Sequence, residues 1–218
     1  MTEERASDFV LDLISQQVLE FGQFTLKSGR QSPYFFNLGA IDLGDGFRRL
    51  GSAYAARLRG LEYGFDVVFG PAYKGIPIAV STAIAMAEAG QRVGVAYNRK
   101  EPKKHGEGGV LVGAPLAERR VVIVDDVLTA GTAVLESASL IREAGGDLVG
   151  ILVALDRQEF VEDGSRTAVE SVSERLAVPV ESIAGLSDVV RCIQNDPGYR
   201  DTLRKLTSYQ RAHCQVFE

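Results

Sequence analysis

Two adjacent carboxylates and a threonine-rich turn follow an apolar run in VVIVDDVLTAGTA, residues 121–133. Asp125 and Asp126 end the run, and Thr-Ala-Gly-Thr (129–132) opens a predicted helix. Backbone N–H groups at a helix N-terminus attract phosphate, and Gly131 lets a ligand approach the backbone closely. Carboxylates beside a phosphate suit ribose hydroxyls, Mg²⁺ or both. The segment therefore predicts a site for a phosphorylated sugar; the alternative is an acidic strand end that only caps a helix.

A lysine lies between two glycines after another apolar run. In FGPAYKGIP (69–77), Gly70 and Gly75 flank Tyr73 and Lys74. The spacing predicts a tight loop whose backbone donors and single ammonium suit a diphosphate. A solvated surface lysine is the commoner explanation when such a segment stands alone. The diphosphate interpretation therefore depends on the acidic segment described above.

A third segment, NRKEPKKHGEGG (98–109), is basic and then rich in glycine, although the chain as a whole is acidic. Its basic residues are Arg99, Lys100, Lys103, Lys104 and His105. Such a segment is either a solvated, mobile loop or a lid that closes cations around a departing anion and excludes water.

Two segments carry groups that could bind a planar ring. TLKSGRQSPYFFN (25–37) contains Lys27 and the exposed-looking pair Phe35 and Phe36, although an aromatic pair on a strand belongs more often to a core. In LDRQE (155–159), Arg157 follows a further apolar run. The fixed fork of donors on its guanidinium suits a carboxylate or a ring carbonyl.

The elements that must position these residues alternate from residue 65 onward. Apolar, β-branched runs typical of strands buried in a parallel sheet cover 65–70, 93–97, 121–126 and 148–156. Between and after them, the patterns predict helices over 76–89 and 132–144, and then a helix, a short strand (178–183) and two further helices. Ligands of such sheets bind outside the carboxyl ends of the strands, which is where the acidic segment, the lysine loop and Arg157 lie.

The N-terminal part predicts a helix over 7–21 with Ser7 as its N-cap, an antiparallel hairpin over 24–39 and a helix over 46–60. Neither a linker nor a repeat divides the chain. We therefore predict one α/β domain over 1–218, with a mainly parallel central sheet flanked by helices. A small hood, formed mainly by about residues 1–40 and part of the C-terminal region, is expected to cover one edge.

Composition excludes several classes of protein. The 218 residues are 45% hydrophobic and carry a net charge of −5, which argues against disorder and against general binding to nucleic acid or anionic membranes. Cys192 and Cys214 suggest neither a disulfide framework nor a zinc site. The charged N-terminus is unlike a signal peptide, and no apolar run approaches the roughly 18 residues of a membrane-spanning helix. We expect a cytoplasmic protein.

The sequence resembles the type I phosphoribosyltransferases. Residues 121–133 are similar to the thirteen-residue motif by which that family binds phosphoribosyl pyrophosphate (PRPP). Three further matches are specific to the orotate branch: Lys-Ser-Gly-Arg with Ser-Pro-Tyr-Phe in 27–35, Arg-Lys-x-x-Lys-x-His-Gly in 99–106, and Leu-Asp-Arg-Gln-Glu in 155–159. The similarity runs from about Val18 past Arg157 and is weaker in the C-terminal third.

This resemblance implies the family fold and the transfer of ribose 5-phosphate from PRPP to N1 of orotate, with Mg²⁺ bound mainly through PRPP. Asp125 and Asp126 are candidate metal ligands through water, and with Lys103 they are the candidate catalytic residues. The resemblance also implies a homodimer in which the basic segment 98–109 acts as a lid and reaches into the active site of the partner subunit. The implied orotate contacts are Phe35, Phe36, Thr129 and Arg157. The implied PRPP contacts are Lys27, Tyr73, Lys74, Arg99, Lys100, Lys103, His105, Asp125, Asp126, Val127, Leu128, Thr129, Ala130, Gly131, Thr132 and Ala133.

Two alternatives stay open at this point. A phosphoribosyltransferase for another base would share the acidic segment and the lysine loop, but it has no reason to combine Lys27, the phenylalanine pair and Arg157. A regulatory protein that senses PRPP without catalysis would not need the lid cations, and it would normally carry a surface for nucleic acid.

Overall fold

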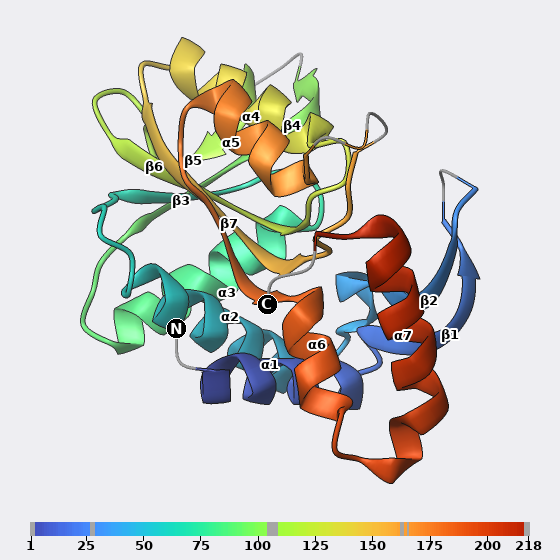
Figure 1. Cartoon of the computed structure of the whole chain (residues 1–218). Helices are drawn as coiled ribbons and strands as arrows, with labels where there is room; N and C mark the ends of the chain where they lie inside the picture. The colour runs from blue at the N-terminus through green and yellow to red at the C-terminus, as the bar shows by residue number, and fades with distance from the viewer. Residues whose placement is uncertain (1–2, 27–28, 104–108, 162–163, 165, 216–218) are drawn as a thin grey trace.

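The computed structural model describes residues 3–26, 29–103, 109–161, 164 and 166–215. A six-stranded sheet forms its centre, with helices packed around it (Figure 1). The strand order is β5-β4-β3-β6-β7-β8. All neighbours run parallel except β4 and β5, which are antiparallel. The strands are β3 (Val67–Gly70), β4 (Gly94–Lys103), β5 (Gly109–Gly113), β6 (Arg120–Val127), β7 (Asp147–Asp156) and β8 (Val180–Gly185). The predicted α/β class and mainly parallel sheet are confirmed.

Helices cover both faces of the sheet, so side chains on successive strand positions enter different cores. On β6, Val122 and Val124 pack in one core, whereas Val121 and Ile123 pack in the other. Because all four are fully buried, the run reads as continuously apolar. The first core includes α1 (Glu3–Ser15), α2 (Gly44–Leu58), α3 (Gly75–Glu88) and α6 (Leu186–Ile193); the second includes α4 (Thr132–Glu143) and α5 (Ala168–Leu176).

The predicted N-terminal helix over 7–21 was wrong at both ends. Helix α1 begins at Glu3 and ends at Ser15, and Leu19–Thr25 forms strand β1. The helix stops because Gln17 adopts the left-handed conformation (φ 55°) and the N–H of Val18 bonds back to the carbonyl of Leu13 at 2.9 Å. Val18 and Phe21 continued the apolar spacing of a helix, although they lie beyond its end.

The hairpin consists of β1 and β2 (Gln31–Phe36), with Phe21 opposite Tyr34. It lies beside α7 (Arg200–His213), as Figure 1 shows. The Tyr34 and Tyr209 rings meet edge-on, with their centres 6.1 Å apart. A 3₁₀ turn at Leu38–Ala40 follows the hairpin. A second 3₁₀ turn, at Pro197–Tyr199, precedes α7. The N-terminal and C-terminal parts of the chain therefore pack together, next to the carboxyl ends of the strands.

The sequence patterns missed strand β5. It lies at one edge of the sheet, none of its five residues GVLVG is fully buried, and it begins and ends with glycine. Much of the predicted basic loop is consequently a hairpin, in which Lys103 at the end of β4 pairs with Gly109. Within the described part of the chain, the helices are too short or too polar to cross a membrane.

Candidate active site

The acidic segment lies where the sequence places it, at the carboxyl end of β6. Asp125 and Asp126 are buried, at 8% and 7% exposure. Asp126 Oδ2 accepts a hydrogen bond from Lys74 Nζ at 2.6 Å, so the lysine loop and the acidic segment meet. Asp126 Oδ1 accepts from the N–H of Val127, and Asp125 Oδ1 accepts from the N–H of Asp126, both at 2.9 Å. These bonds hold both carboxylates at the carboxyl end of β6.

Asp125 is poised to change charge near neutral pH. Burial raises the pKa of its carboxyl to about 7, and the adjacent Asp126 carboxylate adds to the rise. The hydrogen bond from the Asp126 N–H and the charge of Lys74 act in the opposite direction without cancelling it. The hydroxyl of Tyr54 on α2 donates a hydrogen bond to the backbone carbonyl of Asp125 at 2.7 Å. This bond fixes the carboxyl end of β6 to helix α2.

The turn between β6 and α4 presents its backbone to solvent. Leu128 is 5% exposed and packs in the core, which anchors the turn, whereas Thr129 and Ala130 are exposed. Gly131 adopts φ 69°, and a Cβ there would lie 2.6 Å from Val172 Cγ2. Only glycine satisfies both conditions. Thr132 and Ala133 begin α4 and are exposed, so N–H groups and threonine hydroxyls are available to a phosphate.

The lysine loop joins β3 to α3 and is held from β4. Gly70 and Gly75 come so close that a Cβ on Gly70 would collide with the Gly75 carbonyl. The N–H of Ala72 donates to Asn98 Oδ1 at 3.0 Å. Tyr73 is 67% exposed, and Lys100 Nζ lies 4.8 Å from the centre of its ring, a cation–π contact. No sequence signal pointed to Asn98, because a single amide that precedes a basic run has no distinctive spacing.

Only part of the basic segment is described. Arg99 Nη1 donates to the Gly109 carbonyl at 3.3 Å, across the β4–β5 hairpin. For Lys103 the backbone is described but the side chain is not. Lys27, Lys104 and His105 lie outside the described residues. The predicted contacts of these residues therefore stay predictions.

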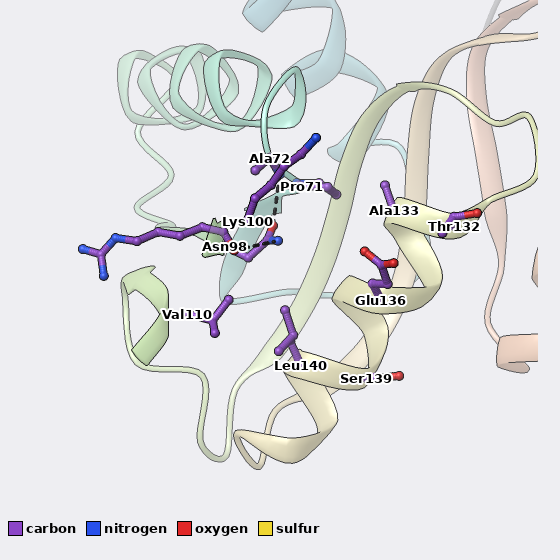
Figure 2. Close-up of a pocket in the computed structure, with 11 residues that line it drawn as sticks. Pro71, Ala72, Asn98, Lys100, Val110, Thr132, Ala133, Glu136, Ser139 and Leu140 are labelled. Atoms are coloured by element: carbon purple, nitrogen blue, oxygen red, sulfur yellow. Dashed lines mark hydrogen bonds between the residues drawn. The ribbon is translucent and has the colours of Figure 1, made fainter. Parts of the chain in front are cut away.

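A cavity of about 720 Å³ opens between the lysine loop, β4 and α4 (Figure 2). Ala72 lines it from the loop, Lys100 from β4, and Thr132 and Glu136 from α4. Asp125 and Asp126 are not among its described lining residues. The cavity thus adjoins the phosphate and diphosphate segments from the α4 side and is one flank of the predicted site.

Arg157 directly follows the carboxyl end of β7, and only 10% of its side chain is exposed. Its Nε and Nη2 atoms donate to Glu159 Oε1 at 3.0 and 2.7 Å. Its guanidinium carbon lies 4.9 Å from the centre of the Tyr34 ring. The guanidinium is therefore held in one orientation beside the hairpin.

The interpretation of Phe35 and Phe36 as an exposed pair was wrong for Phe36. Phe35 is 38% exposed and stacks on Phe24 at 5.4 Å, whereas Phe36 is 5% exposed and packs in the main core. Successive side chains of a strand point to opposite faces. The alternation was visible in the sequence, because Ser32, Tyr34 and Phe36 share the buried face.

Comparison with known proteins agrees with this geometry. The model of the phosphoribosyl transferase domain matches residues 43–184. The orotate phosphoribosyltransferase of Nitrosococcus oceani is 47% identical over 208 residues, covering 95% of this chain and 94% of that protein. The corresponding protein of Legionella pneumophila is 50% identical over 206 residues, covering 94% and 95%.

The crystal structure of the orotate phosphoribosyltransferase of Francisella tularensis superposes with a TM-score of 0.85 at 32% identity, covering 95% of this chain and 100% of that one. Sequence and structure thus agree over nearly the whole length, including the hairpin and the C-terminal helices that lie outside the matched domain. The chain belongs to the orotate phosphoribosyltransferase family.

Proposed function

We propose that this chain transfers ribose 5-phosphate from PRPP to N1 of orotate, in the cytoplasm and as a step of de novo pyrimidine nucleotide synthesis. The products are orotidine 5′-monophosphate (OMP) and pyrophosphate. The observation that carries the proposal is the 2.6 Å contact between Lys74 and Asp126. It joins a loop suited to a diphosphate and a segment suited to ribose 5-phosphate, the two halves of PRPP, at one edge of the sheet.

In this reaction the bond from C1 of ribose to pyrophosphate breaks and a bond from C1 to N1 of orotate forms. The N–H groups of 129–133 hold the 5′-phosphate, which positions C1 through remote binding energy. Asp125 and Asp126 hold the ribose hydroxyls while positive charge develops at C1. Lys74, Arg99, Lys100 and Lys103 stabilise the departing pyrophosphate. The proton on N1 of orotate leaves as the bond from C1 to N1 forms and passes to water or to the departing pyrophosphate, so the proposal includes no general base from the protein.

The acidic residues are suited to a magnesium ion that arrives with PRPP. The described residues contain no cluster of three or more His, Cys, Asp or Glu side chains placed to hold a metal. Both oxygens of Asp126 and one oxygen of Asp125 already accept hydrogen bonds. Mg²⁺ commonly takes one or two carboxylates and fills its remaining positions with water and substrate phosphates. Bound in that way, it would neutralise charge on the pyrophosphate.

The test of this function is turnover followed by the ultraviolet absorbance of orotate. Purified protein is mixed with PRPP, Mg²⁺ and either orotate, uracil or hypoxanthine. Of the three bases, we expect only orotate to be converted. We expect this conversion to stop when Mg²⁺ is chelated. Binding of PRPP without turnover of any base would favour a regulatory protein, and turnover of another base would reassign the substrate.

We expect Arg157 to bind the orotate base. Arg157→Lys keeps the charge but loses the planar fork, so we expect the KM for orotate to rise by about tenfold or more, as for loss of a charged hydrogen bond. The KM for PRPP should change much less. Initial rates measured while each substrate is varied in turn decide the matter: an equal rise in both constants would remove Arg157 from the base site.

We further propose a homodimer in which each lid serves the partner's site. Helix α3 follows the lysine loop and exposes Val80 (41%) and Ile84 (56%), which are one turn apart. This apolar stripe supports an interface beside the site. In such a dimer, the lid of one subunit is expected to work with the acidic residues of the other.

Co-expression of Lys103→Ala and Asp125→Asn chains tests the shared site. A mixed dimer then contains one site with both defects and one site with neither, so we expect about a quarter of the wild-type activity from random pairing. Each variant alone should be far less active. If the lid acts within its own subunit, the mixture will not exceed the mean activity of the two variants.

A further inference from the structure

The carboxylate of Glu159 joins three parts of the chain beside Arg157. Its side chain is 15% exposed. Oε1 accepts from Arg157, from the Tyr209 hydroxyl of α7 at 2.7 Å and from the Tyr34 hydroxyl of β2 at 3.3 Å. Oε2 lies 3.4 Å from Arg30 Nη1. One carboxylate thus ties the strand end that carries Arg157 to the hairpin and to the C-terminal helix.

The backbone around Glu159 is fixed from the same directions. Gln158 adopts φ 57° and is 5% exposed. Its side-chain oxygen accepts from the N–H of Ser187, the second residue of α6, and its Nε2 donates to the Ser187 hydroxyl. Its carbonyl accepts from the N–H of Gln215 at 2.8 Å. These bonds hold the short turn in which the Arg157 and Glu159 side chains meet.

The contacts determine which part of the guanidinium is available. Glu159 engages Nε and Nη2 of Arg157, and Tyr34 lies against the face of the group. Among the described residues, Nη1 of Arg157 has no protein hydrogen bond. Burial and the bond to Glu159 raise the pKa of Tyr209 to about 12, so its hydroxyl stays protonated and keeps donating at neutral pH. The Nε and Nη2 edge of the guanidinium is therefore held by Glu159, whereas Nη1 is available to a ligand.

We propose that Glu159, supported by Tyr209 of the C-terminal helix, is a positioning residue for base recognition: it holds the Arg157 guanidinium so that Nη1 faces orotate. The inference rests on the proposed function. It gives the C-terminal helix a place in the site, although the helix lies beyond the matched domain. A long side chain with several rotatable bonds loses much entropy when it is fixed, so fixing it before orotate arrives strengthens binding.

The alternative is that Glu159 only fastens the hairpin to the sheet. The two roles differ in which kinetic constant they affect. A positioning role acts on orotate and on OMP, because both carry the base. A purely structural role would lower the midpoint of unfolding and would disturb PRPP and orotate together, or neither.

The test compares Glu159→Gln with a matched ion-pair variant, Glu181→Gln. Glu181 pairs with Arg57 near the amino end of β8, away from the carboxyl ends of the strands. For Glu159→Gln we expect the KM for orotate and the Kd for OMP to rise about tenfold, with the KM for PRPP within about twofold. For Glu181→Gln we expect wild-type values of all three constants.

A second variant keeps the test decisive if Glu159→Gln fails to fold. Tyr209→Phe removes one hydroxyl and retains the ring that packs on Tyr34. We expect a rise of about threefold in the KM for orotate, in the same direction and again without a matching change for PRPP. Unchanged orotate constants in a folded variant, or equal changes for both substrates, would overturn the proposal. Absence of orotate turnover in the wild-type protein would instead overturn the proposed function.

Discussion

Replacement of Lys103 by alanine is expected to lower kcat about 10²–10³-fold, the usual loss when a donor to a developing anion is removed. The KM values for both substrates should change little, because the proposed lid contact is expected to form only as pyrophosphate leaves. Lys103 ends β4, directly before the part of the segment that is not described, and it pairs with Gly109 at the start of β5. The prediction rests on the proposed role of the basic segment as a lid over the departing pyrophosphate.

Lys205→Ala is the control for this experiment. Lys205 is an exposed lysine on α7 that pairs with Asp201, so the change removes the same charge far from the lid. Single-turnover measurements separate bond breaking from product release. A Lys103→Ala protein with the kcat of the wild type would remove Lys103 from the catalytic step, and a selective rise in the KM for PRPP would make it a ground-state contact.

Asp125→Asn is expected to make the protein more stable and less active. In the folded protein the pKa of Asp125 is raised from 3.8 to about 7 by burial and by Asp126. The folded state therefore binds a proton more tightly than the unfolded state, and the group destabilises the fold increasingly as the pH rises from about 4 to 7. Asparagine stays neutral, so we expect a gain of up to about 4 kcal/mol at pH 8 and little gain at pH 4.

Urea unfolding at pH 4 and pH 8 measures this difference. Asp66→Asn is the contrasting control, because Arg120 lowers the pKa of Asp66 and loss of that carboxylate should cost more stability at pH 8 than at pH 4. The kcat/KM of Asp125→Asn for PRPP should fall, since a charged acceptor for a ribose hydroxyl is lost. Equal stability changes at both pH values would show that Asp125 carries no buried charge.

The sequence predicted the elements whose signals are continuous along the chain. The centres of the runs that became β3, β6 and β7 are continuously apolar, because helices cover both faces of the sheet. The acidic segment was recognisable because it depends on neighbouring residues at the end of one strand. Local spacing therefore sufficed for Asp125, Asp126 and the turn that follows them.

What the sequence could not predict depends on contacts between distant segments. Glu159 and Tyr209 are 50 residues apart and meet only through the packing of α7 on the hairpin. Asn98 supports Ala72 across neighbouring strands. The end of α1 was misjudged because the apolar spacing continues through Val18 and Phe21, while the turn at Gln17 uses a residue that seldom adopts φ above zero.

The most direct measurement of the central claim is a crystal structure of the protein with OMP. One nucleotide should connect the segments: its phosphate on the N–H groups of 129–133, its ribose hydroxyls on Asp125 and Asp126, and its base on the open edge of Arg157. A nucleotide whose phosphate occupies the turn while its base lies away from Arg157 would contradict the account, as would a phosphate bound anywhere other than this turn.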